Sequence, residues 1–176
     1  MCIRESTAIE LREAIFVLER IICKKVPFKS LLNTCKPQTF VIKFQTPTVI
    51  GRRNYPIEEP YFRLFPHPRD ICENLLKLWN KYVEDSLKIY TEEFLDWVSR
   101  EVYVRAYKLK TSEVIIKNKP IAGFKGFAKY VIRNIDEKFA SLMISLLKFG
   151  EISNIGVKRT YGCGVISLSV CKHCDK

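Results

Sequence analysis

The sequence contains no apolar run that approaches the ~18 to 20 residues of a membrane-spanning helix. Its first residues, Met1-Cys2-Ile3-Arg4-Glu5, lack the basic and then apolar pattern of a secretory signal. We therefore predict a cytoplasmic protein without a membrane partner. Internal repeats and low-complexity tracts are also absent. The 176-residue chain is long enough for one well-cored domain or for two very small ones, and its 47% hydrophobic and 28% charged residues exclude a disordered tail.

Histidines are scarce, and the cysteines do not form a regular framework. The seven cysteines are odd in number and widely scattered, which argues against a secreted disulfide scaffold and favours reduced thiols. The run Cys171-Lys172-His173-Cys174 looks like half of a zinc site, but a second ligand pair is missing. We predict neither a metal site nor a cofactor.

Acidic residues are few in the second half of the chain. Residues 1–104 hold 16 Lys+Arg against 14 Asp+Glu, whereas residues 105–176 hold 14 against 5. Such unevenness reduces stability through repulsion unless a polyanion compensates it. We therefore predict RNA binding through residues 105–164, and a generically basic surface is the alternative.

Helical spacing and capping residues predict several helices. Thr7 and Glu10 form a capping box before Leu11, Ile15, Leu18 and Ile22, which predicts an N-terminal helix. Asp70 is predicted to cap a second helix, a shorter one begins at Thr91, and Asn134 caps the last.

Alternating apolar residues predict strands over residues 39–44, 102–109, 124–132 and 165–170. Five prolines between Pro47 and Pro68 predict a long ordered loop. The order after the first helix is β-α-β-β-α-β, which indicates an α+β, ferredoxin-like fold with helices on one face of a four-stranded antiparallel sheet. We expect an N-terminal helix and connector (1–38), an RNA-binding domain (39–170) and a tail (171–176).

Six of the seven glycines fall between residues 123 and 164. Three of them lie in the segment from Gly156 to Gly164, where glycine can turn successive backbone N–H groups toward one phosphate. The predicted RNA-binding residues of this segment are Asn154, Gly156, Lys158, Arg159, Thr160, Gly162 and Gly164. The alternative is a loop that needs glycine only to turn a corner.

A second cluster, Pro120 to Tyr130, alternates basic and aromatic residues along a predicted strand. Cations and rings on one face suit single-stranded RNA, so Lys125 and Lys129 are added as RNA-binding residues. Phe124 and Phe127 are assigned to packing. Arg52 and Arg53, in the proline-rich segment, complete the set of candidates.

Several motifs together resemble one known family. They are Phe44-Gln45-Thr46-Pro47-Thr48, Leu75-Leu76-Lys77-Leu78-Trp79-Asn80, Gly123-Phe124-Lys125-Gly126 and the Leu147 to Gly164 stretch. Over residues 39–170 the chain is similar to the C-terminal half of the CRISPR-associated endoribonucleases that cut precursor CRISPR RNA within its repeats, a branch of the RAMP superfamily. The resemblance implies ferredoxin-like folds, binding of repeat RNA, a part in antiviral defence, and metal-independent cleavage by the RNA's own 2′-OH.

The resemblance leaves the catalytic residues unknown. Many family members carry the catalytic histidine in a first ferredoxin-like domain, for which this chain has no room. His67, in Phe65-Pro66-His67-Pro68, is the default candidate, although a passive surface turn explains it better. Tyr161, Lys125 and Lys158 could act as acid or cation.

Three functions remain open from the sequence. The first is an RNA-binding protein of precursor CRISPR RNA processing, with or without cleavage. The second is a truncated, non-catalytic RNA-binding subunit of a CRISPR effector complex, and the third is a basic protein-interaction module. The expected partners are CRISPR repeat RNA and either a separate chain that supplies the first domain or a second copy in a homodimer.

Overall fold

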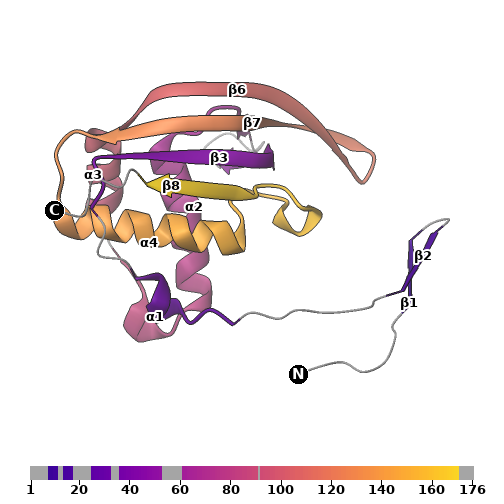
Figure 1. Ribbon diagram of the computed structural model, residues 1–176, viewed down its shortest axis with the longest axis horizontal. Coiled ribbons are helices and arrows are strands. Elements are labelled where there is room, and N and C mark those ends of the chain that lie inside the picture. Colours follow the sequence, from indigo (N-terminus) through magenta and orange to yellow (C-terminus); the bar gives the residue numbers. More distant parts are fainter. Residues whose placement is uncertain are drawn as a thin grey trace.

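The computed structural model describes residues 8–11, 14–17, 25–32, 36–52, 61–90 and 92–170. Its centre is a four-stranded antiparallel sheet with the strand order β6-β7-β3-β8. The strands are β3 (Thr39–Thr48), β6 (Val102–Ile116), β7 (Lys119–Ile132) and β8 (Ile166–Val170). The helices are α2 (Pro68–Tyr82), α3 (Glu92–Glu101) and α4 (Glu137–Ser153). This order confirms the predicted ferredoxin-like fold (Figure 1).

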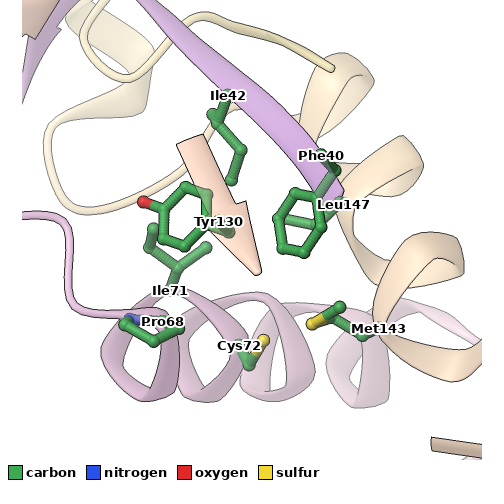
Figure 2. A pocket seen from close by; sticks show the side chains of 8 residues that line it. All are labelled: Phe40, Ile42, Pro68, Ile71, Cys72, Tyr130, Met143 and Leu147. Carbon is green, nitrogen blue, oxygen red and sulfur yellow. The ribbon is translucent and has the colours of Figure 1, made fainter. Parts of the chain in front are cut away.

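The apolar face of the sheet forms the core because alternate side chains of each strand point the same way. In β3 the buried apolar residues are Phe40, Ile42 and Phe44. The Phe40 ring stacks on Tyr130 of β7, with 5.0 Å between ring centroids. Figure 2 shows Phe40, Ile42 and Tyr130 facing side chains of α2 and α4 across an apolar cavity of about 10 Å³. A cavity of that size has no room for a ligand.

Helix α2 holds the core and the following connection together. Trp79 is 1% exposed and packs edge-on against Phe28 and Phe149. Its Nε1–H donates to Leu87 O (2.9 Å), in the 3-10 turn η1 (Asp85–Leu87). The Asn80 side chain bonds both the N–H and the C=O of Ile89. These bonds fix the irregular segment between α2 and α3 without further secondary structure.

Two helix starts differ from prediction. Helix α2 begins with Pro68 after the N-cap His67, so Asp70 is a buried first-turn residue rather than the cap. Proline at the first helical position is favourable because its missing N–H needs no partner there. In α4 the cap is Asp136, whose carboxylate accepts from Phe139 N–H (2.9 Å), and not Asn134. For α3, the predicted start Thr91 lies outside the described residues, and the helix is described from Glu92.

The predicted N-terminal helix is wrong. Residues 8–11 and 14–17 form strands β1 (Ala8–Leu11) and β2 (Ala14–Val17), which pair antiparallel. The run Ile15-Phe16-Val17 is β-branched and aromatic, which favours a strand over a helix. Thr7, Leu18 and Ile22 lie outside the described residues. A single helical turn, α1 (Phe28–Leu31), follows.

The prolines do not exclude regular structure between residues 47 and 68. Strand β3 continues through Pro47 to Thr48, and β4 (Ile50–Arg52) pairs with β5 (Tyr61–Arg63). Prolines at a strand's end cost little because few ladder bonds remain to be lost there.

No helix in the described part of the chain is long and apolar enough to cross a membrane.

Candidate nucleic-acid interface

The glycine-rich segment after α4 closes onto the end of β3. Gly164 N–H donates to Pro47 O (3.1 Å), Val157 N–H donates to Val49 O (2.8 Å), and Ile155 N–H donates to Gly164 O (2.9 Å). The segment contains the 3-10 turn η2 (Arg159–Tyr161) and lies at the end of the sheet where β3 stops (Figure 1). We call residues 154–165 the glycine loop.

The three glycines of the loop are required by the backbone and not by a phosphate. Gly156, Gly162 and Gly164 have φ values of +80°, +79° and +78°, as the sequence led us to expect. Their N–H groups, however, donate within the chain, to Asn74 Oδ1, Arg159 O and Pro47 O respectively. The expected cradle of glycine N–H groups is therefore wrong, because these donors already have partners.

Two polar side chains that the sequence interpretation missed hold the loop in place. Asn74 Oδ1 accepts from Gly156 N–H (2.8 Å), and Thr46 Oγ1 accepts from Val165 N–H (3.0 Å). Asn74 occupies a position of α2 between buried Ile71 and Leu78, at helical spacing. A polar residue within an apolar stripe was thus the signal that could have identified Asn74 as a structural partner.

Asn154, the first residue of the glycine loop, is strained. Its φ of 59° has the expected positive sign, but its ψ of 166° lies in a region that glycine alone populates readily. Asn154→Gly should therefore raise the free energy of unfolding by about 1 kcal/mol. Glycine removes the backbone strain from the folded state, and this gain exceeds the entropic cost of ordering a more flexible residue. Urea unfolding followed by circular dichroism measures this difference.

The control for Asn154 is Asn118, which has φ 60° in the two-residue turn between β6 and β7. Asparagine is well suited to such hairpin turns, so Asn118→Gly should change stability by only a few tenths of a kcal/mol. Equal effects at the two positions would contradict strain at Asn154.

The cations of the glycine loop are accessible. Lys158 and Thr160 are exposed and Arg159 is half-buried. Arg159 Nη1 is buried, and in the described part of the chain it has no hydrogen-bond acceptor. Because this atom is buried, a phosphate oxygen would be bound by the other N–H donors of the half-buried guanidinium.

The second predicted cluster, on β7, meets the glycine loop at the end of β3. A Cβ on Gly123 would lie 2.9 Å from Thr48 O, and a Cβ on Gly156 would lie 2.2 Å from Val49 O. Both glycines therefore allow the same segment, residues 48–49, to pass close to their backbones. The two clusters, far apart in the sequence, become neighbours at one end of the sheet.

The face of the sheet opposite the helices is basic. Its central residues come from alternate positions of four strands: Lys43 on β3, Lys108 and Lys110 on β6, Lys125, Phe127 and Lys129 on β7, and Ser167 and Ser169 on β8. We call this surface the open face. Lys125 and Lys129 thus share one face of the sheet, as predicted. The assignment of Phe127 to packing is wrong, because this side chain is 41% exposed, whereas Phe124 is buried.

These cations have no counter-ions within the described residues. Ion pairs between described residues have N···O distances of at most 4.0 Å. None of them includes an open-face lysine, Lys158 or Arg159. Arg133, by contrast, bonds Glu101 through Nε (3.1 Å) and Nη2 (3.2 Å). Hydrogen bonding to Arg133 lowers the pKa of Glu101, so this pair is already neutralised.

The remaining candidates are less informative. Arg52 contributes its backbone to β4, and Arg53 lies outside the described residues. His67 is the N-cap of α2, where its C=O accepts from Ile71 N–H (3.2 Å). Tyr161 is 51% exposed on the glycine loop. Burial raises the pKa of the Cys163 thiol, which therefore stays neutral.

Acidic groups do not gather into a metal site in the part of the chain that the structure describes, where no three His, Cys, Asp or Glu side chains lie together. A hollow of about 420 Å³ lies between α2 and α3, and Glu73 and Glu92 are among its lining residues. Its carboxylates make it unsuited to phosphate. The predicted Cys171–Cys174 ligands lie outside the described residues.

Comparison with known proteins points to one family. Residues 42–166 match the family model described as CRISPR-associated endoribonuclease Cas6. The chain is 30% identical over 139 residues to a Cas6 endoribonuclease of Streptococcus thermophilus, covering 78% of this chain and 54% of that protein. For the Mycobacterium tuberculosis Cas6 the identity is 27% over 137 residues, covering 76% and 40% respectively. The chain thus spans about half the length of these relatives.

Solved structures share the fold. A Cas6 in a substrate mimic complex superposes with a TM-score of 0.76 at 20% identity, covering 94% of this chain and 70% of that one. At this identity the likeness establishes the ferredoxin-like architecture alone.

Proposed function

Because this chain belongs to the CRISPR-associated endoribonuclease Cas6 family, we propose that it binds the repeat of precursor CRISPR RNA and takes part in its processing. The observation that carries the proposal is the basic surface made by the open face and the glycine loop. Its lysines and Arg159 have no carboxylate partners among the described residues, which suits a polyanion. Among the predicted candidates, the side chains of Lys125, Lys129, Lys158, Arg159 and Thr160 remain our proposed RNA contacts, whereas the N–H groups of Gly156, Gly162 and Gly164 already have partners within the chain.

The reaction that family membership suggests needs no metal ion. The 2′-oxygen of one nucleotide attacks the adjacent phosphorus and the bond from phosphorus to the 5′-oxygen breaks. A base accepts the 2′-OH proton and an acid protonates the leaving 5′-oxygen, giving a 2′,3′-cyclic phosphate. Cations such as Lys158 and Arg159 would stabilise the charge that develops on the phosphate.

A second candidate function is RNA binding without cleavage. It is favoured by the shortage of acid–base groups, since His67 is the only histidine among the described residues and its backbone caps α2. In this case a separate chain, a second copy, or another component of a CRISPR complex would supply the catalytic group.

The test is to incubate the purified chain with its cognate repeat RNA in EDTA. We expect binding, with slow cleavage or none. Any cleavage should give one discrete cut with a 2′,3′-cyclic phosphate, and a 2′-deoxy nucleotide at the cut site should abolish it. Cleavage that requires Mg²⁺ and tolerates the deoxy nucleotide would refute this mechanism.

His67→Ala then assigns the role of the histidine. A loss of cleavage beyond about a hundredfold would make His67 a general acid or base. Unchanged cleavage would leave Tyr161, Lys125 and Lys158 as the candidates.

A further inference from the structure

Phe127 is an exposed aromatic ring in the middle of a basic sheet face. It lies on β7, an inner strand of the sheet, and its register partners are Lys43 on β3 and Lys108 on β6. Paired side chains across neighbouring strands have Cβ atoms about 5 Å apart, so the ring has a lysine on either side. With 41% of its surface exposed, Phe127 contributes little to the core.

Lysines continue above and below the ring along the strands. Lys110 pairs with Lys125 two residues from Phe127 in one direction, and Lys129 lies two residues away in the other. Successive rows are about 7 Å apart, and the glycine loop follows about 20 Å from Lys129 at the end of β3. The central open-face positions contain no aspartate or glutamate.

The helix side of the domain has the opposite charge. Residues 68–101, which form α2, η1 and α3, hold five basic and eight acidic side chains. Among the described residues, α2, η1 and α3 thus carry a net negative charge, whereas the open face and the glycine loop carry the positive charge that attracts a polyanion.

From this arrangement we infer that the open face binds a single-stranded segment of RNA, with one base stacked on Phe127 and phosphates paired with Lys43 and Lys108. This inference rests on the proposed function and specifies which form of RNA the sheet takes. An aromatic ring surrounded by cations suits unpaired bases, because their flat faces are accessible only outside a duplex. A protein partner fits less well, since lysines are depleted from protein interfaces.

The test compares Phe127→Ala and Phe127→Trp in the full chain, with fluorescein-labelled oligouridylate of 12 nucleotides as the probe. Loss of one stacked base should weaken binding by about 5- to 150-fold in Phe127→Ala, whereas Phe127→Trp should retain it. Tyr90→Ala removes a ring that is 76% exposed beside the α2–α3 hollow, so its affinity should stay that of the wild type. Thermal unfolding of each variant shows that the fold is retained.

The outcomes separate this inference from the proposed function. If the wild type binds repeat RNA and Phe127→Ala binds oligouridylate equally well, stacking on the open face is refuted and the proposed function stands. If the wild type binds neither RNA, both fail. If Phe127→Ala changes the oligomeric state by light scattering while RNA affinity is unchanged, the open face is a protein interface and the inference is overturned.

Discussion

Gly164→Ala should lower the free energy of unfolding by more than about 4 kcal/mol, which is exceptional for one methyl group. A Cβ at this position would lie 1.8 Å from Ile155 O and 2.9 Å from the carbon of the same carbonyl. Neither backbone can move freely, because Ile155 N–H bonds Gly164 O (2.9 Å) and Gly164 N–H bonds Pro47 O (3.1 Å). A shift that removes the clash breaks both bonds and detaches the glycine loop from β3.

Gly162→Ala is the matched control, since Gly162 has almost the same φ, +79°, but no atom within 4 Å of its would-be Cβ. It should cost only the left-handed strain of an L-residue, about 1–2 kcal/mol. For a domain of this size, Gly164→Ala should then unfold about 10 °C below the wild type, and Gly162→Ala only a few degrees below it. Equal losses would show that strain, rather than close backbone approach, determines the need for glycine.

RNA affinity should fall by about 10³- to 10⁴-fold between 50 and 500 mM salt. The open face and the glycine loop carry enough cations to neutralise about five phosphates. Each phosphate contact on a single strand contributes about 0.7 to the slope of log affinity against log salt, which gives a slope near −3.5. Fluorescence anisotropy with the repeat RNA across a salt series measures it.

Two double variants show which cations cause the slope. Lys158→Ala with Arg159→Ala should make the slope shallower by about 1.4, because two contacts are lost. Lys77→Ala with Lys81→Ala removes the same charge from the exposed side of α2 and should leave the slope unchanged. Exposed charges contribute little to folding, and the buried Nη1 of Arg159 has no hydrogen bond to lose within the described residues, so both variants should unfold at nearly the wild-type temperature. A slope near zero in the wild type would refute electrostatic binding altogether.

The order of the four sheet strands and of the helices α2, α3 and α4, and most of the core, could be predicted because their signals are local. Phe40, Ile42 and Phe44 alternate along one strand, and Ile71, Leu75 and Trp79 recur at helical spacing. Each pattern therefore predicts both the type of element and its buried face. Helix starts were less accurate, since Asp70 and Asn134 are good capping residues that happen to lie beside Pro68 and Asp136.

The open face could be predicted only in part, because a β-bulge changes which residues of β6 share a side. The pairing passes from Val104↔Tyr130 to Ala106↔Lys129, which leaves Arg105 as an extra residue. Strict alternation from Tyr103 would have placed Lys108 and Lys110 on the helix side. After the bulge they share the open face with Phe127, and nothing in the sequence marks that single inserted residue.

The hydrogen-bond partners of the glycine N–H groups could not be predicted either, because they lie in segments that are distant in the sequence. Gly156 bonds a side chain 82 residues away, and Gly164 bonds the backbone of Pro47. A run of glycines, lysine and arginine predicts a tight turn that carries positive charge. It does not predict whether the backbone N–H groups of that turn are available to a ligand.

The bonds that tie the glycine loop to β3 and α2 also determine how it meets its ligand. A flexible basic loop loses conformational freedom on binding, at about 1–2 kcal/mol for each backbone residue that becomes ordered. Here Ile155, Gly156, Val157 and Gly164 are already hydrogen-bonded before any ligand arrives. Lys158 and Arg159 are therefore presented from a preorganised backbone, so most of their electrostatic attraction is available as affinity and little is lost to ordering the loop.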